Sequence, residues 1–160
     1  MARTSSRQLI GAPVDRLFDL AVLPERLPEW DPLVVTVSGV DSGAGGGPTF
    51  DAVLRIAGRD VEARLVVAHV ERGRRIRVDG AGRDGGRFSW TRRFEVAGTF
   101  GAIVETDFEY DLPARHFGEP ETYRRGLENA ICQAVENLAR LVRAQAVPVA
   151  TGAEASRHRR

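Results

Sequence analysis

Between Phe50 and Leu112 the chain alternates apolar and polar residues with a period of two, and this pattern constrains the fold more than any other feature. In the clearest stretch, residues 102–112, mostly apolar side chains at even positions alternate with acidic ones after Ile103. Such alternation is typical of an antiparallel sheet with one face on the core and one in water. From Pro120 the apolar residues recur at helical spacing, which predicts one long helix after the strands.

Further elements are predicted before these strands. A short strand ends at Ile10, and a helix begins at Pro13, where proline is tolerated as the first helical residue. Prolines then break the chain into short turns around Trp30, and β-branched residues predict a strand from Leu33 to about Val40. With the strands after Phe50, we expect about seven strands, with short helices after the first.

The long helix is expected to run to about Gln145 and to be stopped by Pro148. A length of 160 residues suits one domain with one core, so we expect a single domain of residues 1–146. Residues 147–160, rich in Ala, Gly, Ser and Arg, are predicted to form a flexible Arg-rich tail.

Composition excludes several kinds of chemistry. All 23 basic residues are arginine, so a Schiff base on a lysine amine is impossible. Cys132 is the single cysteine, and the three histidines do not fit a zinc-binding motif. We therefore expect no metal and no cofactor.

Charge and hydropathy bear on partners and location. The 23 positive and 22 negative side chains are interspersed along most of the chain, which gives no footprint for nucleic acid. No apolar run has the length of a membrane span or of a secretion signal. We expect a cytoplasmic protein without stable membrane insertion.

Three segments carry a family resemblance: residues 10–20 (IGAPVDRLFDL), 28–32 (PEWDP) and 136–141 (ENLARL). In their order and spacing, residues 5 to 145 resemble the START-like helix-grip superfamily, in its bacterial polyketide cyclase/dehydrase and lipid-transport branch. The resemblance implies an α+β fold in which a curved antiparallel sheet wraps around the long C-terminal helix, with an apolar cavity between them. It does not imply one reaction, because that superfamily holds cyclases, lipid carriers and receptors.

The alternation predicts which residues would line such a cavity. They share the apolar parity of their strands, one face of the long helix, or a place in the proline-rich turn. The predicted ligand-binding residues are Trp30, Phe50, Leu54, Ile56, Phe88, Trp90, Thr106, Phe108, Tyr123, Leu127 and Ile131. Small-molecule pockets are mostly apolar, but the same residues would equally fill a solid core.

Arg92 interrupts the apolar parity of residues 88–96, and an unpaired charge among apolar side chains is costly. A ligand carboxylate, enolate or phenolate oxygen would suit its donor fork, and in a cyclase Arg92 would stabilise an oxyanion. Two alternatives remain open. A bulge near Thr91 would turn Arg92 or Arg93 to the wet face, or an internal acid would pair with Arg92.

Three further residues are weighed for chemistry. Tyr110 is predicted to be a proton donor, with a structural hydrogen bond as the alternative. His69 has the apolar parity of its strand and would be a general base, although histidines at strand ends are often simply exposed. Asp31 is interpreted as a turn-forming residue.

Glu105, Asp107 and Glu109 resemble a cluster of catalytic or metal-binding carboxylates. Their parity places them on the wet face, opposite Arg87 and Arg93 of the preceding strand. We expect a ladder of cross-strand salt bridges there, with a cation site as the alternative.

The leading hypothesis is that the chain binds a small hydrophobic ligand, polyketide-like, aromatic or acyl, as a cofactor-independent cyclase or aromatase of secondary metabolism. Its catalytic residues would be Arg92, Tyr110 and His69, and its substrate could arrive tethered to an acyl carrier protein. Few aromatic or hydroxyl residues lie in the first strands, which departs from the aromatase pattern. The alternatives are a non-catalytic carrier of lipids or hydrophobic metabolites, and an interaction module with a filled core.

Overall fold

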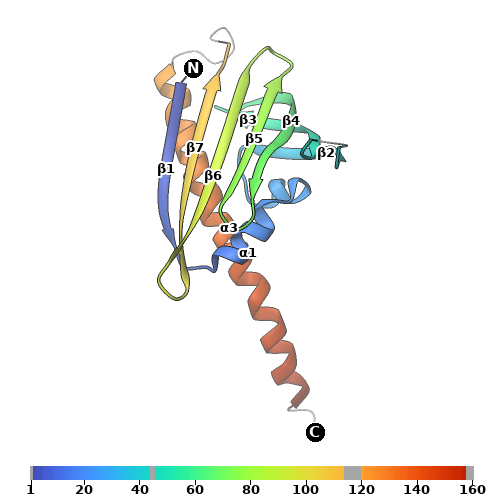
Figure 1. The fold of residues 1–160 in the computed structure, drawn as a ribbon, viewed down its shortest axis with the longest axis vertical. Helices are drawn as coiled ribbons and strands as arrows, with labels where there is room; N and C mark the ends of the chain where they lie inside the picture. The colour runs from blue at the N-terminus through green and yellow to red at the C-terminus, as the bar shows by residue number, and fades with distance from the viewer. Residues whose placement is uncertain (1, 44–45, 114–119, 158–160) are drawn as a thin grey trace.

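A computed structural model describes residues 2–43, 46–113 and 120–157, with side chains described as far as Gln145. Seven strands form one antiparallel sheet in the order β1-β7-β6-β5-β4-β3-β2 (Figure 1). The elements are β1 (Ala2–Ile10), α1 (Val14–Ala21), the 3-10 helix η1 (Pro24–Glu29), β2 (Val34–Asp41), β3 (Thr49–Ile56), β4 (Arg59–Glu71), β5 (Arg75–Gly82), β6 (Arg87–Ala97), β7 (Gly101–Asp111) and α3 (Pro120–Arg157). The predicted α+β architecture is confirmed.

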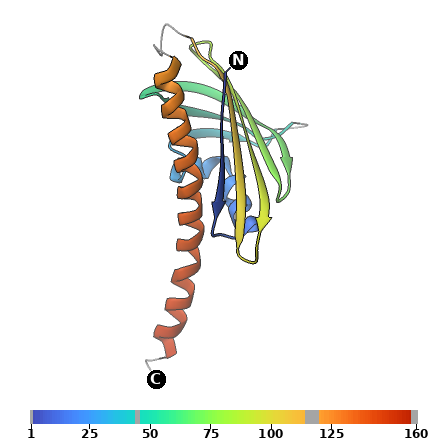
Figure 2. The same ribbon diagram turned by 90° about the vertical axis from the view of Figure 1, so that its left-hand side faces the viewer.

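The sheet curves around α3, which lies along one of its faces and extends beyond it (Figure 2). The first and last strands are neighbours, since β1 pairs along its whole length with β7, from Ala2 opposite Tyr110 to Ile10 opposite Ala102. The face of the sheet turned toward α3 is called the inner face below. The opposite, outer face carries the charged residues of the alternating strands.

Inner-face side chains and one face of α3 form the core. Residues of α3 at helical spacing are fully or almost fully buried: Leu127, Ile131, Ala134, Val135, Leu138 and Val142. All of the predicted ligand-lining residues are buried except Tyr123, which is partly buried. The alternation therefore predicted correctly that these side chains turn inward.

The segment between β1 and β2 closes the rest of the inner face. In α1 the apolar residues Val14, Leu17 and Phe18 are buried, as their helical spacing requires. In η1 the buried residues are Pro24 and Leu27. These short helices bring the turn that contains Trp30 into the interior.

The helix α3 differs from its predicted end. It continues from Gln145 through Pro148 to Arg157, so the predicted flexible tail is helical as far as that residue, and residues 158–160 lie outside the described part. An internal proline removes one helical hydrogen bond and introduces a clash, yet the helix continues past Pro148. No helix in the described part of the chain is long and apolar enough to cross a membrane.

Candidate functional site

Arg92 lies on the inner face of β6. The register of β6 is continuous on both sides, with Arg92 opposite Ile76 of β5 and Thr106 of β7, so no bulge near Thr91 turns it outward. The residue is only 3% exposed. A guanidinium in this position requires a partner inside the protein.

That partner is Asp31, in the turn after η1. One NH2 group of Arg92 donates to Oδ2 of Asp31 at 2.8 Å, and the two side chains are 4% and 1% exposed. The other carboxylate oxygen, Oδ1, accepts the backbone N–H of Leu33 at 3.0 Å. Asp31 therefore forms the turn, as its sequence context indicated, and it is also the internal acid that the sequence left as an alternative.

Both tryptophans of the chain flank the Arg92 guanidinium. Its Cζ atom lies 4.9 Å from the ring centroid of Trp30 and 6.0 Å from that of Trp90. The backbone carbonyl of Trp30 accepts a hydrogen bond of 3.1 Å from the Asn137 side chain, which ties the turn to α3. Cation–π contacts of this kind are strongest where water is excluded.

Several buried polar atoms around this pair have no hydrogen-bond partner among the described residues. They are Nε of Arg92, Nε1 of Trp30 and Oγ1 of Thr106, with Oγ1 of Thr4 further along the sheet. Native proteins leave few buried polar groups unpaired, so such atoms are candidate contacts for a water molecule or a bound group. Here they gather around one guanidinium and its cross-strand neighbour.

A small void lies beside Arg92. Its volume is about 10 Å³, which is the threshold for a single water molecule. Its lining, from the end of α1, η1 and strands β3 to β6, consists of Ala21, Val22, Pro24, Leu27, Phe50, Val67, Ile76, Val78, Trp90 and Arg92. The resemblance implied an apolar cavity, but beside Arg92 the described side chains leave room for little more than one water molecule, and a ligand would have to displace some of them.

Aromatic rings continue from Arg92 along the inner face. Phe88, Trp90 and Phe108 stack with interplanar angles of 8–9° and centroids 6.2–6.5 Å apart. Tyr110 continues the row, 5.7 Å from Phe108, and Tyr123 of α3 meets it edge-on at 5.8 Å. The structure thus brings together the aromatic residues that the alternation assigned to one lining.

Tyr110 and His69 are not placed beside Arg92. Tyr110 pairs with Phe88, four residues along β7 from Thr106, which corresponds to roughly 13 Å of strand. Burial raises the pKa of Tyr110, and Tyr123 adds to that shift. The Tyr110 side chain therefore starts from a different part of the inner face than the Arg92 side chain.

The placement of His69 on the inner face is wrong. The register between β4 and β5 shifts between Val67 and His69, so His69 pairs with the exposed Arg77. Its side chain is 46% exposed and its Nε2 lies 3.2 Å from a carboxylate oxygen of Glu71. A one-residue irregularity reverses the face of every later side chain, and period-two counting does not detect it.

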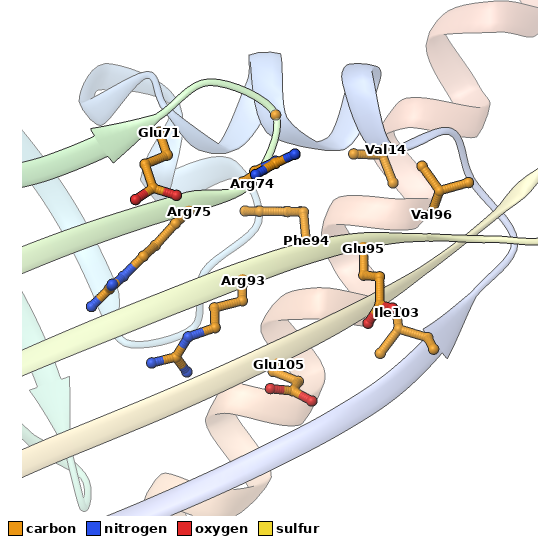
Figure 3. A pocket seen from close by; sticks show the side chains of 11 residues that line it. Val14, Glu71, Arg74, Arg75, Arg93, Phe94, Glu95, Val96, Ile103 and Glu105 are labelled. Atoms are coloured by element: carbon orange, nitrogen blue, oxygen red, sulfur yellow. The ribbon is translucent and has the colours of Figure 1, made fainter.

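A larger hollow of about 610 Å³ opens on the outer face, beside the turn between β4 and β5 (Figure 3). Three arginines line it, Arg74, Arg75 and Arg93, and three glutamates oppose their charge (Figure 3). Arg93 is already engaged with Asp107 at 2.7 Å. Because its charges balance and Arg93 is already paired, we place the candidate site at Arg92 instead.

Two acidic residues of β7, Glu105 and Asp107, form ion pairs on the outer face, whereas Glu109 forms none with the described residues. Asp107 accepts hydrogen bonds from Arg93 at 2.7 Å and from Arg3 at 2.8 Å, while Glu105 lies 3.5 Å from Arg7. Burial tends to raise the pKa of Asp107, but its hydrogen bonds from both arginines outweigh this and lower it. The described part of the chain contains no group of three or more His, Cys, Asp or Glu arranged to hold a metal ion.

Arg3 and Arg7 were missed by sequence reasoning. They belong to β1, and its pairing with β7 joins segments about a hundred residues apart. The predicted partner Arg93 is correct, whereas Arg87, opposite Asp111, makes no ion pair with any described residue.

The curved sheet, the short helices after the first strand and the long C-terminal helix together define a START-like helix-grip protein. The chain belongs to the polyketide cyclase/dehydrase and lipid transport family, whose model matches residues 1–143. A comparison with curated proteins found no significant match.

Solved structures with the same fold are distant in sequence. Protein CV1439 from Chromobacterium violaceum is 20% identical, with a TM-score of 0.66 over 88% of this chain and 96% of its own. A START superfamily protein from Mycobacterium smegmatis is 15% identical, with a TM-score of 0.65 over 89% of this chain and 95% of its own. The di-domain ARO/CYC protein StfQ from the steffimycin biosynthetic pathway is 13% identical, with a TM-score of 0.71 over 90% of this chain and 51% of its own.

Proposed function

We propose that this protein binds a small hydrophobic molecule on the inner face of the sheet, with the polar end of the molecule at Arg92. The observation that carries the proposal is a buried guanidinium that lines an apolar void and keeps an unpartnered Nε donor among the described residues. The row of aromatic rings along β6 and β7 supports it, because such a surface suits an aromatic or long-chain ligand. Delivery of the ligand by an acyl carrier protein stays a prediction.

Tryptophan fluorescence tests this proposal directly, because both tryptophans contact Arg92. Titration with methyl nonyl ketone should change the emission saturably, and the same ligand should raise the melting temperature. Replacing Ala21, which lines the void, by Leu should abolish both effects, whereas Arg93→Gln in the outer hollow should leave them intact. No response with any of a broad set of acyl and aromatic ligands would instead support a filled core.

A second candidate function, cofactor-independent cyclisation, is favoured by one observation. The buried Asp31 carboxylate lies next to donors suited to a carbonyl oxygen. Such a pair could remove a proton from the carbon beside a bound carbonyl, with Arg92 stabilising the enolate oxygen. His69 and Tyr110 have no part in this step.

Isotope exchange separates the enzyme from the carrier without knowledge of the substrate. Enolisation in D₂O replaces hydrogen by deuterium at the carbons beside the carbonyl of the bound ketone. Faster incorporation than in buffer, lost in Asp31→Asn, would establish the catalytic function. Binding without accelerated incorporation would leave the carrier function as the one supported.

A further inference from the structure

The charge balance of the interior bears on which ligands it accepts. Asp31 and Arg92 are the two buried charged residues of the described chain. They contact each other at 2.8 Å, with side chains 4% and 1% exposed. The interior is therefore formally neutral before a ligand enters, and a ligand meets an ion pair instead of a free cation.

A carboxylate ligand would add an uncompensated negative charge to this pair. To bind Arg92, the ligand carboxylate would have to lie beside the Asp31 carboxylate or displace it, and either arrangement leaves two anions and one cation in a low-dielectric interior. Moving the Asp31 side chain out to water would break a second hydrogen bond, because its Oδ1 also accepts the backbone N–H of Leu33 at 3.0 Å. The same geometry that neutralises Arg92 therefore disfavours anions.

A neutral acceptor oxygen carries no such penalty. Nε of Arg92 and Nε1 of Trp30 are buried N–H donors that find no acceptor among the residues described. The hydroxyl of Thr106, directly across from Arg92 on β7, is a third buried group that is likewise unpaired in that part of the chain. A carbonyl oxygen has two lone pairs and can accept from such donors without altering the net charge.

We infer that Asp31 sets the charge specificity of the interior site, which accepts hydrophobic molecules ending in a neutral carbonyl and rejects the corresponding carboxylates. The inference rests on the proposed function, because it names the class of ligand bound at the same place. Asp31 acts here as a specificity residue, through the charge that it places beside Arg92.

The test uses two probes that share a nine-carbon chain and a carbonyl, methyl nonyl ketone and decanoate. Wild-type protein should bind the ketone at least about tenfold more tightly than decanoate at neutral pH. In Asp31→Asn the amide oxygen can still accept from Leu33 N–H, but Arg92 loses its counter-charge. The ratio of the affinity for decanoate to the affinity for the ketone should then rise by at least about tenfold.

Two controls isolate the charge. The double variant Asp31→Asn with Arg92→Gln is neutral and should not gain affinity for decanoate. Decanamide has the shape of decanoate but no charge. Its affinity for the wild-type protein should therefore be close to that of the ketone and not to that of decanoate. That comparison needs no variant and decides the matter even where Asp31→Asn fails to fold.

The outcomes distinguish this inference from the proposal on which it rests. Equal binding of ketone and decanoate by wild-type protein, or an unchanged preference in folded Asp31→Asn, would overturn the charge specificity while leaving ligand binding in place. Binding of none of the probes by wild-type protein would overturn both.

Discussion

Arg92 is held by contacts of different kinds, an ion pair to Asp31 and the faces of Trp30 and Trp90. Loss of the guanidinium would leave the Asp31 carboxylate buried and uncompensated, which costs far more than the pair contributes in net stability. Replacing one residue of the pair should therefore lower the stability of the protein more than replacing both. Affinity and stability thus have to be measured together at this site.

Arg92→Gln should therefore lower the free energy of unfolding by about 3–5 kcal/mol in urea denaturation. Adding Asp31→Asn should restore part of that loss, since no buried charge remains. Arg77→Gln, which breaks the exposed pair with Asp79, is the matched control and should cost less than about 1 kcal/mol. A single Arg92→Gln variant as stable as the control would contradict a buried ion pair.

Asp107 should make the stability of the folded protein depend on pH. Its pKa is lowered in the folded state, so its stabilising effect is complete above an unfolded-state pKa of about 3.9 and is lost as the pH falls through the folded value. Wild-type protein should lose stability between pH 7 and pH 3, and Asp107→Asn should lose about 1 kcal/mol less over that range. Identical pH profiles for the wild-type protein and Asp107→Asn would refute the prediction.

At the scale of elements, the inner face of β5 and β6 depends on a glycine. A Cβ atom at Gly80 would lie 2.1 Å from the ring of Phe88, which stacks on Trp90 and Phe108. Glycine within a strand costs about 0.5–1 kcal/mol in backbone entropy, and here it makes room for the aromatic row.

Gly80→Ala should consequently destabilise the protein, by about 1–3 kcal/mol, because overpacking outweighs the entropic gain. In contrast, Gly126→Ala on α3 has nothing within 4 Å of the added Cβ and should stabilise the helix by up to about 1 kcal/mol. Thermal unfolding of the two variants compares the same chemical change in two environments. Stabilisation by both would show that Phe88 does not depend on Gly80 for space.

The elements also show what sequence reasoning can reach. Period-two alternation assigned the strands and their inner faces because burial follows backbone geometry. It failed at His69, where a local register shift reverses parity. It predicted that Arg92 lies on the inner face but did not identify the partner of Arg92. That partner, Asp31, lies 61 residues away in a turn that has no periodicity.

At the scale of the whole molecule, the described side chains leave a void of only about 10 Å³ beside Arg92. The void borders the end of α1 and η1 on one side and strands β3 to β6 on the other, so enlarging it has to separate these elements. The resemblance to a cavity-forming fold could not predict this closed packing, because the same pattern of inward residues suits a filled core and a lined cavity alike.

Ligand binding should therefore be visible in the backbone of the turn that follows η1. The amide N–H groups of Trp30 and Asp31 both donate to the carbonyl of Leu27, and a ligand beside them would stabilise the turn. Saturating methyl nonyl ketone should slow hydrogen exchange at these amides relative to those of the hairpin between β6 and β7. Uniform slowing throughout the protein would indicate general stabilisation without a local site.

The indole N–H signal of Trp30 tests the central claim most directly. The chain has two tryptophans, so a ¹H–¹⁵N spectrum has two indole signals, which Trp90→Phe assigns. Nε1 of Trp30 has no partner among the described residues, so a ketone oxygen bound at Arg92 should move its proton signal downfield in a saturable manner. An indole signal that stays in place when methyl nonyl ketone is demonstrably bound would contradict a ligand site at Arg92.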